Sequence, residues 1–437
     1  MTDCTAKRIE FSKLGRRRLE TEFSGGEVSS DGGLVLLREV DRRLKLSERV
    51  AAVLDDPRDP DRITHPLVDL LRQRVYAIVH GYEDLNDHAQ LRDDALLQSV
   101  LERQDVLGSA PTLCRLENRA SRAAAWALHR ELIETFIASF QAPPAELVLD
   151  FDATDDPLHG KQEGRFFHGY YDCYCYLPLY VFCGEQLLVS YLRPSKIDGA
   201  KHAWAILALL VKRLRQAWPT VKIILRADSG FCRHRMLTWC ERHGVGYCVG
   251  LAQNTRLNAL TQVHRERLAV QFAASQTQQR EFAALRYGAY SWHAERRVIA
   301  RLEHSAQGDN PRYIVTNLEG EGAALYDALY CARGEMENRI KEAQLGLFAD
   351  RTSCHHFVTN QFRLLLSSLA YVLVERLRTL ALAGTEFARM QATTLRAKLL
   401  KIGAVIIRNT RRVRVLLSSA YPYQEIFRRA ALALRSP

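Results

Sequence analysis

The sequence predicts an α/β protein whose helices pack on a mixed sheet, and two observations predict it. The first is a run of three strand-like segments, residues 147–151, 176–183 and 186–192, with Gly184 and Glu185 as a tight connection between the last two. The second is the alternation that follows: a helix at 202–218, a strand at 221–227, a helix at 234–243 and a strand at 246–250. Such an order indicates a mixed sheet with helices packed on it.

This order is compatible with a ribonuclease H-like core, to which we assign residues 146–251 and 317–385. Residues 1–145 show helical apolar spacing and end at the break Pro143-Pro144, so they are predicted to form a helical N-terminal domain. Residues 252–316 lose the alternation and are too long for a loop, which predicts a β-rich insertion. Two helices, at 326–348 and 357–382, follow, and residues 386–437 form a basic C-terminal region with a hairpin-like segment at 404–418.

Composition and charge limit the class of protein. The 437 residues are 47% hydrophobic and 25% charged, which is ordinary globular usage and argues against a disordered chain. The formal net charge of +11 favours an anionic partner, nucleic acid before membrane. Residues 396–437 contain ten Arg or Lys against one acid, Glu425, and Arg411, Arg412 and Arg414 are our candidates for contacts to DNA.

Targeting signals and cysteine spacing favour a reducing, cytoplasmic location. The N-terminus lacks the apolar core of a signal peptide, and the longest apolar run, residues 364–374, is too short to span a bilayer. None of the ten cysteines forms the CxxC pair of a structural zinc site. Residues 109–119 place Ser109 ahead of an Arg-bearing helix, as in the second helix of a DNA-reading pair; a packed helical hairpin explains the same pattern.

Acidic residues lie at the ends of two predicted strands. Asp150 and Asp152 share one face of the first strand, and Asp152 is favoured as a metal ligand because it lies nearer the strand's end. Asp228 follows the strand 221–227 directly and precedes the turn Ser229-Gly230. Two other interpretations stay open: the first pair ends a strand in solvent, and Asp228 caps a helix.

A third acid lies on the later helix. Tyr330, Arg333, Glu337, Lys341 and Gln344 recur at steps of three and four, which places them on one helix face. Such a face offers one metal ligand together with donors to phosphate, although an exposed face of ion pairs has the same spacing. Three oxygen ligands on separate elements suit Mg²⁺ or Mn²⁺, and two such ions promote displacement at phosphorus.

The triad and its context resemble the DDE transposases of bacterial insertion sequences, in the group with a Tyr-x2-Arg-x3-Glu-x6-Lys signature. The resemblance rests on Asp152, on Asp228 within RADSGF, and on the helix with Tyr330, Arg333 and Glu337. The segments DGGLVLLREVDRRL at 31–44, DATDDPLHG at 152–160 and ENRIKE at 337–342 agree with it. It covers nearly the whole chain.

The resemblance implies a ribonuclease H-like core, two divalent ions bound by Asp152, Asp228 and Glu337, and a helical N-terminal domain that binds DNA. It further implies cut-and-paste transposition in the bacterial cytoplasm at the nucleoid, with a homodimer joining double-stranded terminal inverted repeats to target DNA. Tyr330, Arg333, Lys341 and Gln344 would contact phosphates, and Trp292 in the insertion would stack on a flipped base.

One position departs from the signature, because the expected Lys is Gln344. Its loss weakens end binding unless Lys341, one turn earlier, substitutes for it. An impaired, non-catalytic DNA-binding protein and a plain ribonuclease H-like nuclease therefore remain as alternatives.

Overall fold

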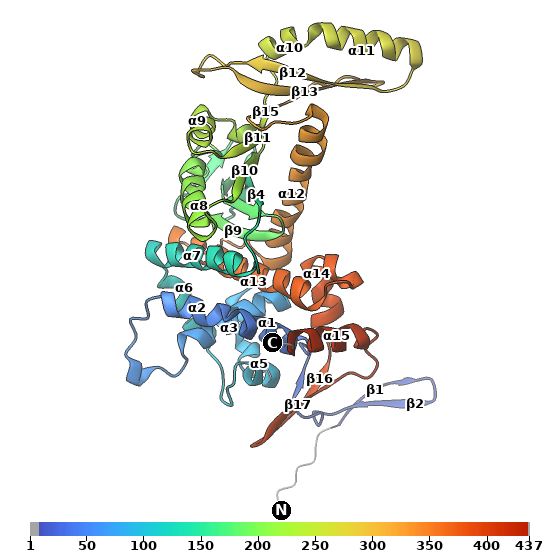
Figure 1. Ribbon diagram of the computed structural model, residues 1–437. Helices are drawn as coiled ribbons and strands as arrows, with labels where there is room; N and C mark the ends of the chain where they lie inside the picture. The colour runs from blue at the N-terminus through green and yellow to red at the C-terminus, as the bar shows by residue number, and fades with distance from the viewer. Residues whose placement is uncertain (1–7, 436–437) are drawn as a thin grey trace, which may run out of the picture. The chain divides into compact units, whose positions relative to one another are not determined.

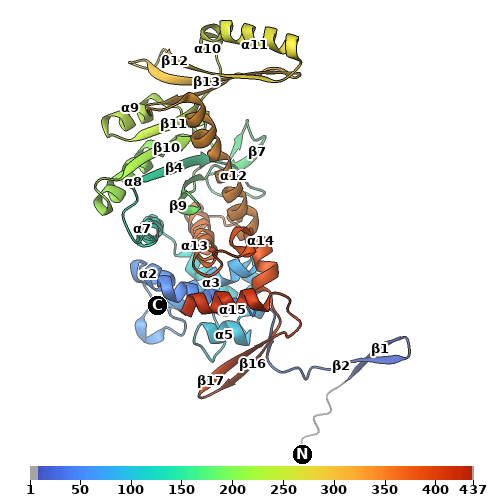
Figure 2. The ribbon, with the colours of Figure 1, turned by 45° about the vertical axis from the view of Figure 1, so that its right-hand side comes forward.

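The computed structural model describes residues 8–435, which form two compact units (Figures 1 and 2). The first unit contains the residues up to Arg119 and those from Leu373 onward, and the second contains Ala120–Val372. The division falls inside the long helix α13, Phe357–Ala381. The catalytic candidates Asp152, Asp228 and Glu337 all belong to the second unit.

The first unit is built from both ends of the chain. Its N-terminal part contains β1 (Ile9–Leu14), β2 (Arg17–Thr21), β3 (Val28–Ser29), α1 (Leu34–Leu44), α2 (Leu46–Val53), η1 (Pro60–Arg62), α3 (Leu67–His80), η2 (Leu85–Asp87), α4 (His88–Leu91), α5 (Ala95–Val100) and α6 (Ala110–Asn118). Its C-terminal part contains η7 (Glu386–Arg389), α14 (Ala392–Leu395), η8 (Arg396–Leu400), β16 (Ala404–Asn409), β17 (Arg412–Leu417) and α15 (Gln424–Arg435).

Backbone contacts join these two parts. β16 pairs with both β17 and β3 in an antiparallel sheet. The amide of Gly32 donates to the carbonyl of Ile402 at 2.8 Å, and that of Gly33 donates to Leu400 at 3.0 Å. A side chain at Gly33 would lie 2.4 Å from the Leu400 Cα, so only glycine allows this approach before α1 begins.

The first described residues are strands, although residues 1–145 were expected to be mostly helical. β1 and β2 pair into an antiparallel hairpin whose side chains are almost all exposed. The run of three arginines from Arg16 to Arg18 interrupts the apolar–polar alternation near the turn. The sequence pattern therefore did not indicate two strands here. The helical spacing holds from α1 onward.

The second unit carries the large sheet. Its first half contains α7 (Arg122–Ala138), β4 (Glu146–Ala153), β5 (Asp156–Pro157), β6 (Phe166–His168), β7 (Cys173–Tyr176), β8 (Leu179–Cys183), β9 (Gln186–Tyr191), α8 (Ala203–Ala217), β10 (Lys222–Ala227), η3 (Ser229–Phe231), α9 (His234–Arg242) and β11 (Gly246–Leu251). Its second half contains α10 (Thr255–Leu260), α11 (Gln262–Ser275), β12 (Gln279–Tyr287), β13 (Arg296–Ser305), β14 (Gly308–Asp309), β15 (Arg312–Thr316), η4 (Ala324–Tyr330), η5 (Cys331–Arg333), α12 (Gly334–Lys341) and η6 (Glu342–Gly346).

The strand order of this sheet is β12-β13-β15-β11-β10-β4-β8-β9, and β14 pairs with β13. β4, β10 and β11 are parallel, whereas β8 and β9 continue β4 as antiparallel strands. The predicted mixed sheet is thus confirmed. Since β4 and β10 are neighbours in parallel, their carboxyl ends meet at one edge of the sheet.

Apolar side chains cover both faces of the sheet. One face packs in a large core with α8 and α9, which contribute Leu207, Leu210 and Leu237 (Figure 1). On the other face Cys248, Ile299 and Ile314 pack against η4. The segment η4 to η6 is helical throughout but passes through π, 3₁₀ and α geometry in turn. Short π segments interrupt helices most often at functional sites.

Three features of the fold differ from the sequence-based expectation. The strand expected at 176–183 is split into β7 and β8, because Pro178 has no amide hydrogen for a sheet ladder. The stretch 252–316, expected to be β-rich, opens with the two helices α10 and α11, which lie over β12 and β13 (Figure 2). The boundary expected near residue 145 falls within the second unit, since α7 packs on β9.

Among the described residues, α13 alone has the length and hydropathy of a membrane span. However, 89% of its most apolar window is buried within the protein. The helix therefore has the environment of a core helix.

Candidate active site

The sheet brings the two aspartates together. The parallel register aligns Ala227 of β10 with Phe151 of β4, so Asp228 and Asp152 are the next residues on neighbouring strands. Asp152 is the penultimate residue of β4 and Asp228 directly follows β10; each comes after a buried residue and is itself partly accessible. The carboxyl ends of parallel strands are the usual location of ligand sites in open α/β sheets.

Backbone amides hold both carboxylates in position. Asp152 Oδ1 accepts from the amide of Ala153 at 2.9 Å, and Asp228 Oδ1 accepts from the amide of Gly230 at 2.9 Å. Asp228 is therefore also the N-cap of η3, as the competing interpretation of the sequence expected. The cap fixes one oxygen of Asp228, whose negative charge acts on Asp152.

Arg333 links the later helix to this edge of the sheet. Its guanidinium donates to Asp152 Oδ2 at 3.2 Å and to Glu337 Oε1 at 2.7 Å. The second contact is an i,i+4 pair, which the sequence spacing predicts. The first contact joins residues 181 positions apart in the sequence, so only the tertiary structure reveals it. Arg333 thus bridges the first and third acids.

Asp152 lies in an electrostatically unfavourable place for a carboxylate. Burial raises its pKa to about 6, and the negative charges of Asp228 and Glu337 add to the rise, while Arg333 opposes it. Tyr330 belongs to the same cluster: burial raises its pKa to about 12, and the charge of Asp228 acts in the same direction. A cation at this cluster would relieve the repulsion among the three acids.

Asp150 has a different environment from Asp152, although both project from the same face of β4. Its carboxylate accepts two hydrogen bonds from Arg226, the second at 2.7 Å, and its side chain is fully buried. Arg226 also donates to the carbonyl of Leu329 at 2.6 Å. Asp150 is therefore engaged in a buried ion pair, whereas Asp152 is the accessible one of these two aspartates.

Two further predicted residues lie along the same helical segment. Lys341, the last residue of α12, is exposed. Gln344 in η6 is half-buried, and its Nε2 donates to the carbonyl of Asp155 at 3.0 Å. Gln344 therefore contacts the loop that follows Asp152, at a position from which a longer cationic side chain would also reach this loop.

The remaining candidates lie elsewhere. Trp292, in the connection between β12 and β13, packs edge-on against Tyr287 at 5.6 Å and beneath Arg296 at 4.9 Å, in contact with the core. Arg411, Arg412 and Arg414 are exposed on the β16–β17 hairpin of the first unit. The structure brings Asp152, Asp228, Glu337, Arg333 and Tyr330 together, and neither Trp292 nor these arginines share their contacts.

Sequence reasoning missed Gly250, the penultimate residue of β11. A Cβ there would lie 2.6 Å from the Tyr330 hydroxyl oxygen, 2.7 Å from the Ser229 amide and 3.1 Å from the Asp228 carbonyl carbon. The strand therefore needs glycine so that Tyr330 and the turn after Asp228 can approach it. A glycine at the end of an apolar strand was the only signal in the sequence.

Gly250→Ala is expected to destabilise the second unit by about 1–3 kcal/mol, because the added methyl group overlaps backbone atoms that cannot rotate away. Thermal unfolding would measure the change. Gly334→Ala is the matched control: it lies on α12, a Cβ there meets nothing within 4 Å, and it is expected to be neutral or slightly stabilising. Equal melting temperatures for Gly250→Ala and wild type would contradict the close approach.

Asp152→Asn is expected to stabilise the protein. The pKa of Asp152 rises from 3.8 to about 6 on folding, so the folded state binds the proton more tightly and wild-type stability falls as the pH rises through this window. Above pH 6 the ionised carboxylate costs about 1–3 kcal/mol, which asparagine removes. Melting temperatures measured without divalent ions should diverge from pH 4 to pH 6 and then stay apart. A variant less stable than wild type at pH 8 would contradict this account.

The donor chemistry fits an oxygen-preferring divalent ion, because the charges of Asp228 and Glu337 act on the buried Asp152 carboxylate and Arg333 only partly opposes them. In residues 8–435, however, no three His, Cys, Asp or Glu side chains already converge in ligating geometry. Glu337 is turned onto Arg333. Asp152 and Asp228 would thus hold an ion as a pair, and Glu337 would join them on release from Arg333.

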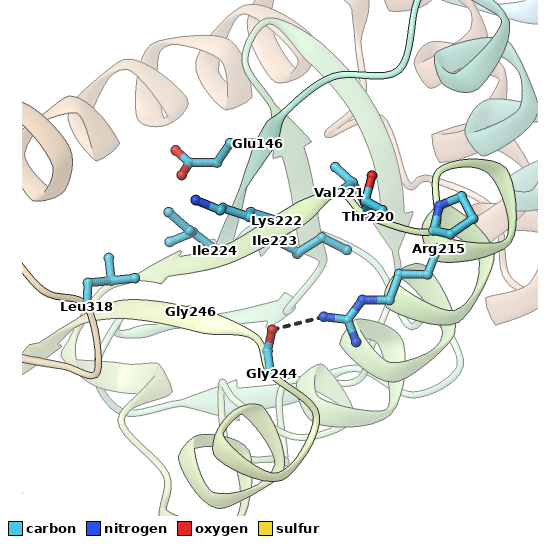
Figure 3. A pocket seen from close by; sticks show the side chains of 11 residues that line it. Glu146, Arg215, Thr220, Val221, Lys222, Ile223, Ile224, Gly244, Gly246 and Leu318 are labelled. Carbon is cyan, nitrogen blue, oxygen red and sulfur yellow. Dashed lines mark hydrogen bonds between the residues drawn. The ribbon is translucent and has the colours of Figure 1, made fainter.

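A separate pocket of about 590 Å³ lies at the opposite end of the strands (Figure 3). Glu146, Lys222 and Gly246, which line it, are the first residues of β4, β10 and β11. Arg215 closes one side by donating to the carbonyl of Gly244 at 2.9 Å. A six-residue strand is roughly 20 Å long, so this pocket is remote from the carboxylates.

Fold and site together define an α/β protein in which acidic residues gather at the carboxyl ends of two parallel strands. The chain belongs to a family of transposases: residues 11–436 match the family model described as transposase DDE domain group 1. No curated protein matches the sequence. Among solved structures the chain is similar to a piggyBac transposase, seen by cryo-EM in a synaptic complex with hairpin DNA. The identity is 11%, the TM-score is 0.38, and the match covers 84% of this chain and 79% of that one. So weak a similarity adds nothing to the family match.

Proposed function

We propose that this protein is the DNA transposase of a bacterial insertion sequence, of the group with the Tyr-x2-Arg-x3-Glu-x6-Lys signature. It would cleave DNA at terminal inverted repeats and join the ends to target DNA at the nucleoid. The observation that carries the proposal is the meeting of Asp152 and Asp228 on neighbouring parallel strands, with Glu337 linked to them through Arg333. The family match over nearly the whole chain supports it.

The strand order supports a ribonuclease H-like core. β4, β8 and β9 form an antiparallel meander, and β10 and β11 extend the sheet from the other side of β4, parallel to it. In this proposal the core is interrupted after β11 by the segment that contains α10, α11, β12 and β13. The helices of residues 31–118 would form the DNA-binding part of the first unit.

Two Mg²⁺ or Mn²⁺ ions would supply charge stabilisation at the reacting phosphate. Asp152 and Asp228 would hold them, and Glu337 would complete the set. Because Arg333 binds both Asp152 and Glu337, it keeps the acids close while no ion compensates their charge. Its guanidinium would then be free to bind a phosphate of the DNA.

The other residues of the helix would position the DNA. The Tyr330 hydroxyl group lies against the turn after Asp228 and keeps its proton at neutral pH, since burial raises its pKa to about 12. It would therefore donate to a phosphate oxygen. Lys341 is exposed and would contribute positive charge, whereas Gln344 holds the loop after Asp152. Arg411, Arg412 and Arg414 would contact the DNA backbone from their exposed hairpin, and a homodimer would bring two ends together.

One assay tests the proposal. The full chain is incubated in Mg²⁺ with linear DNA that carries the inverted repeats flanking its gene, and the products are separated on denaturing gels. Cleavage at the repeat ends followed by joining to a target plasmid is expected. Binding without cleavage would instead identify a non-catalytic DNA-binding protein, and cleavage without joining a nuclease.

A further inference from the structure

An aromatic hairpin lies beside the carboxylates. After β4 the chain forms a small antiparallel sheet in the order β5-β7-β6. In the turn between β6 and β7, the Tyr171 hydroxyl group lies 3.5 Å from the carbonyl of Ala153, the residue after Asp152. Burial raises the pKa of Tyr171 to about 12, and the charges of Asp155 and Asp152 contribute to the rise. The turn is therefore close to the reacting centre.

This hairpin presents aromatic rings to solvent. Phe167 is 53% exposed, Tyr174 46% and Tyr170 86%. Phe167 and Tyr174 are direct partners in the β6–β7 register, so they share one face, and their rings meet edge-on at 5.6 Å. Soluble proteins rarely expose several large rings in one place unless the surface binds something.

Cations accompany the rings. The Arg165 guanidinium lies 4.6 Å from the centre of the Tyr174 ring, and the Lys196 ammonium lies 5.2 Å from the centre of the Phe166 ring. Within residues 8–435, the one hydrogen bond that the Arg165 side chain donates goes to the backbone carbonyl of Gly160. Its charge is therefore available to an anionic ligand, and its planar group adds to the stacking surface.

We propose that Arg165, Phe167, Tyr170 and Tyr174 form a platform that stacks on unpaired bases of the DNA strand whose phosphate lies at the carboxylates. Every base has a π face, so rings that carry an adjacent cation bind single-stranded DNA with little sequence preference. The position of this face next to Ala153 and Asp152, together with the Arg165 guanidinium over the Tyr174 ring, favours DNA over a protein partner if the carboxylates act on a phosphodiester. The inference rests on the proposed function, because it takes DNA as the substrate.

This platform is distinct from Trp292. The Trp292 ring packs against Tyr287 and Arg296, and it comes from the connection between β12 and β13. The hairpin rings lie 15 to 22 residues after Asp152 in the sequence and are exposed. Unpaired bases next to the cleaved phosphate would therefore meet the hairpin.

The test uses the full chain and a dodecamer of thymidine with one 5-iodouracil, compared with a duplex of the same length without inverted repeats. Phe167→Ala/Tyr170→Ala should weaken binding of the single strand about tenfold or more, and leave duplex binding within about twofold. Trp126→Ala is the matched control, since Trp126 is an equally exposed ring on α7 of the same unit. Tyr170→Phe, which keeps the ring, should bind as wild type does.

Ultraviolet cross-linking followed by peptide mapping should attach the iodouracil to residues 165–174. Unchanged affinity of the double variant for the single strand, or an equal loss on duplex, would overturn the platform. These measurements need no cleavage, so they separate the two proposals. If the platform binds single strands but the protein does not cleave the inverted-repeat ends, only the proposal of transposition is refuted. If the double variant cleaves normally and its affinity for the single strand is unchanged, only the platform is refuted.

Discussion

Asp228→Asn is expected to abolish strand cleavage in Mg²⁺, by at least about 10³-fold, while binding to the inverted repeat stays intact. Asparagine keeps the Oδ1 atom that accepts from the Gly230 amide, so the turn after β10 and the cap of η3 persist. Only the negative charge is lost. The substitution therefore separates the capping role of this residue from its role in holding a divalent ion.

Cleavage would be measured as the nicking rate of labelled repeat-end DNA, and binding as the shift of the same DNA on native gels. Asp228→Ala should lose cleavage equally and, in addition, lose about 1 kcal/mol of stability with the cap. Asp309→Asn, which removes a charge from the distant β14, should cut normally. If Asp228→Asn still nicks the DNA, the assignment of the active site is wrong.

Arg226→Met is expected to cause the largest loss of stability, about 3–5 kcal/mol, because it removes the ion-pair partner of the buried Asp150 carboxylate. Asp150 and Arg226 are register partners on β4 and β10, and both side chains are at least nine-tenths buried. Burial raises the pKa of Asp150 even with Arg226 present, so the carboxyl group depends on this partner. Asp150→Asn should also destabilise, because it leaves the buried Arg226 guanidinium without a charged partner, whereas Arg333 keeps Glu337 after Asp152→Asn.

Chemical denaturation of the single variants and of Arg226→Met/Asp150→Leu would measure the coupling. The double variant should recover much of the loss, since it buries no unpaired charge. Arg213→Met is the control: Arg213 pairs with Glu134 through two hydrogen bonds, but both side chains are about one-third exposed, so less than about 1 kcal/mol is expected. Similar losses for Arg213→Met and Arg226→Met would show that burial of the pair is unimportant.

Local patterns predicted the central elements well. β10, α9, α13 and the β16–β17 hairpin lie within two residues of their expected ends, since their apolar spacing and flanking breaks are strong. Patterns failed where tertiary contacts decide. α10 and α11 were missed, because each buries little and shows a weak apolar face, and α7 was grouped with the preceding helices although it packs on β9.

The sequence by itself determined which residue types end β4 and β10, and it placed Arg333 and Glu337 on one helix turn. It favoured Asp152 over Asp150 only through its position nearer the strand's end, because a period of two puts both on the same face of the strand. Only the tertiary structure shows that Asp150 is held in an ion pair, since its partner Arg226 lies 76 positions away. The same holds for Arg333 and Asp152, and for the exposure of the aromatic hairpin. Burial and long-range pairing are properties of the folded chain, and local periodicity carries no information about them.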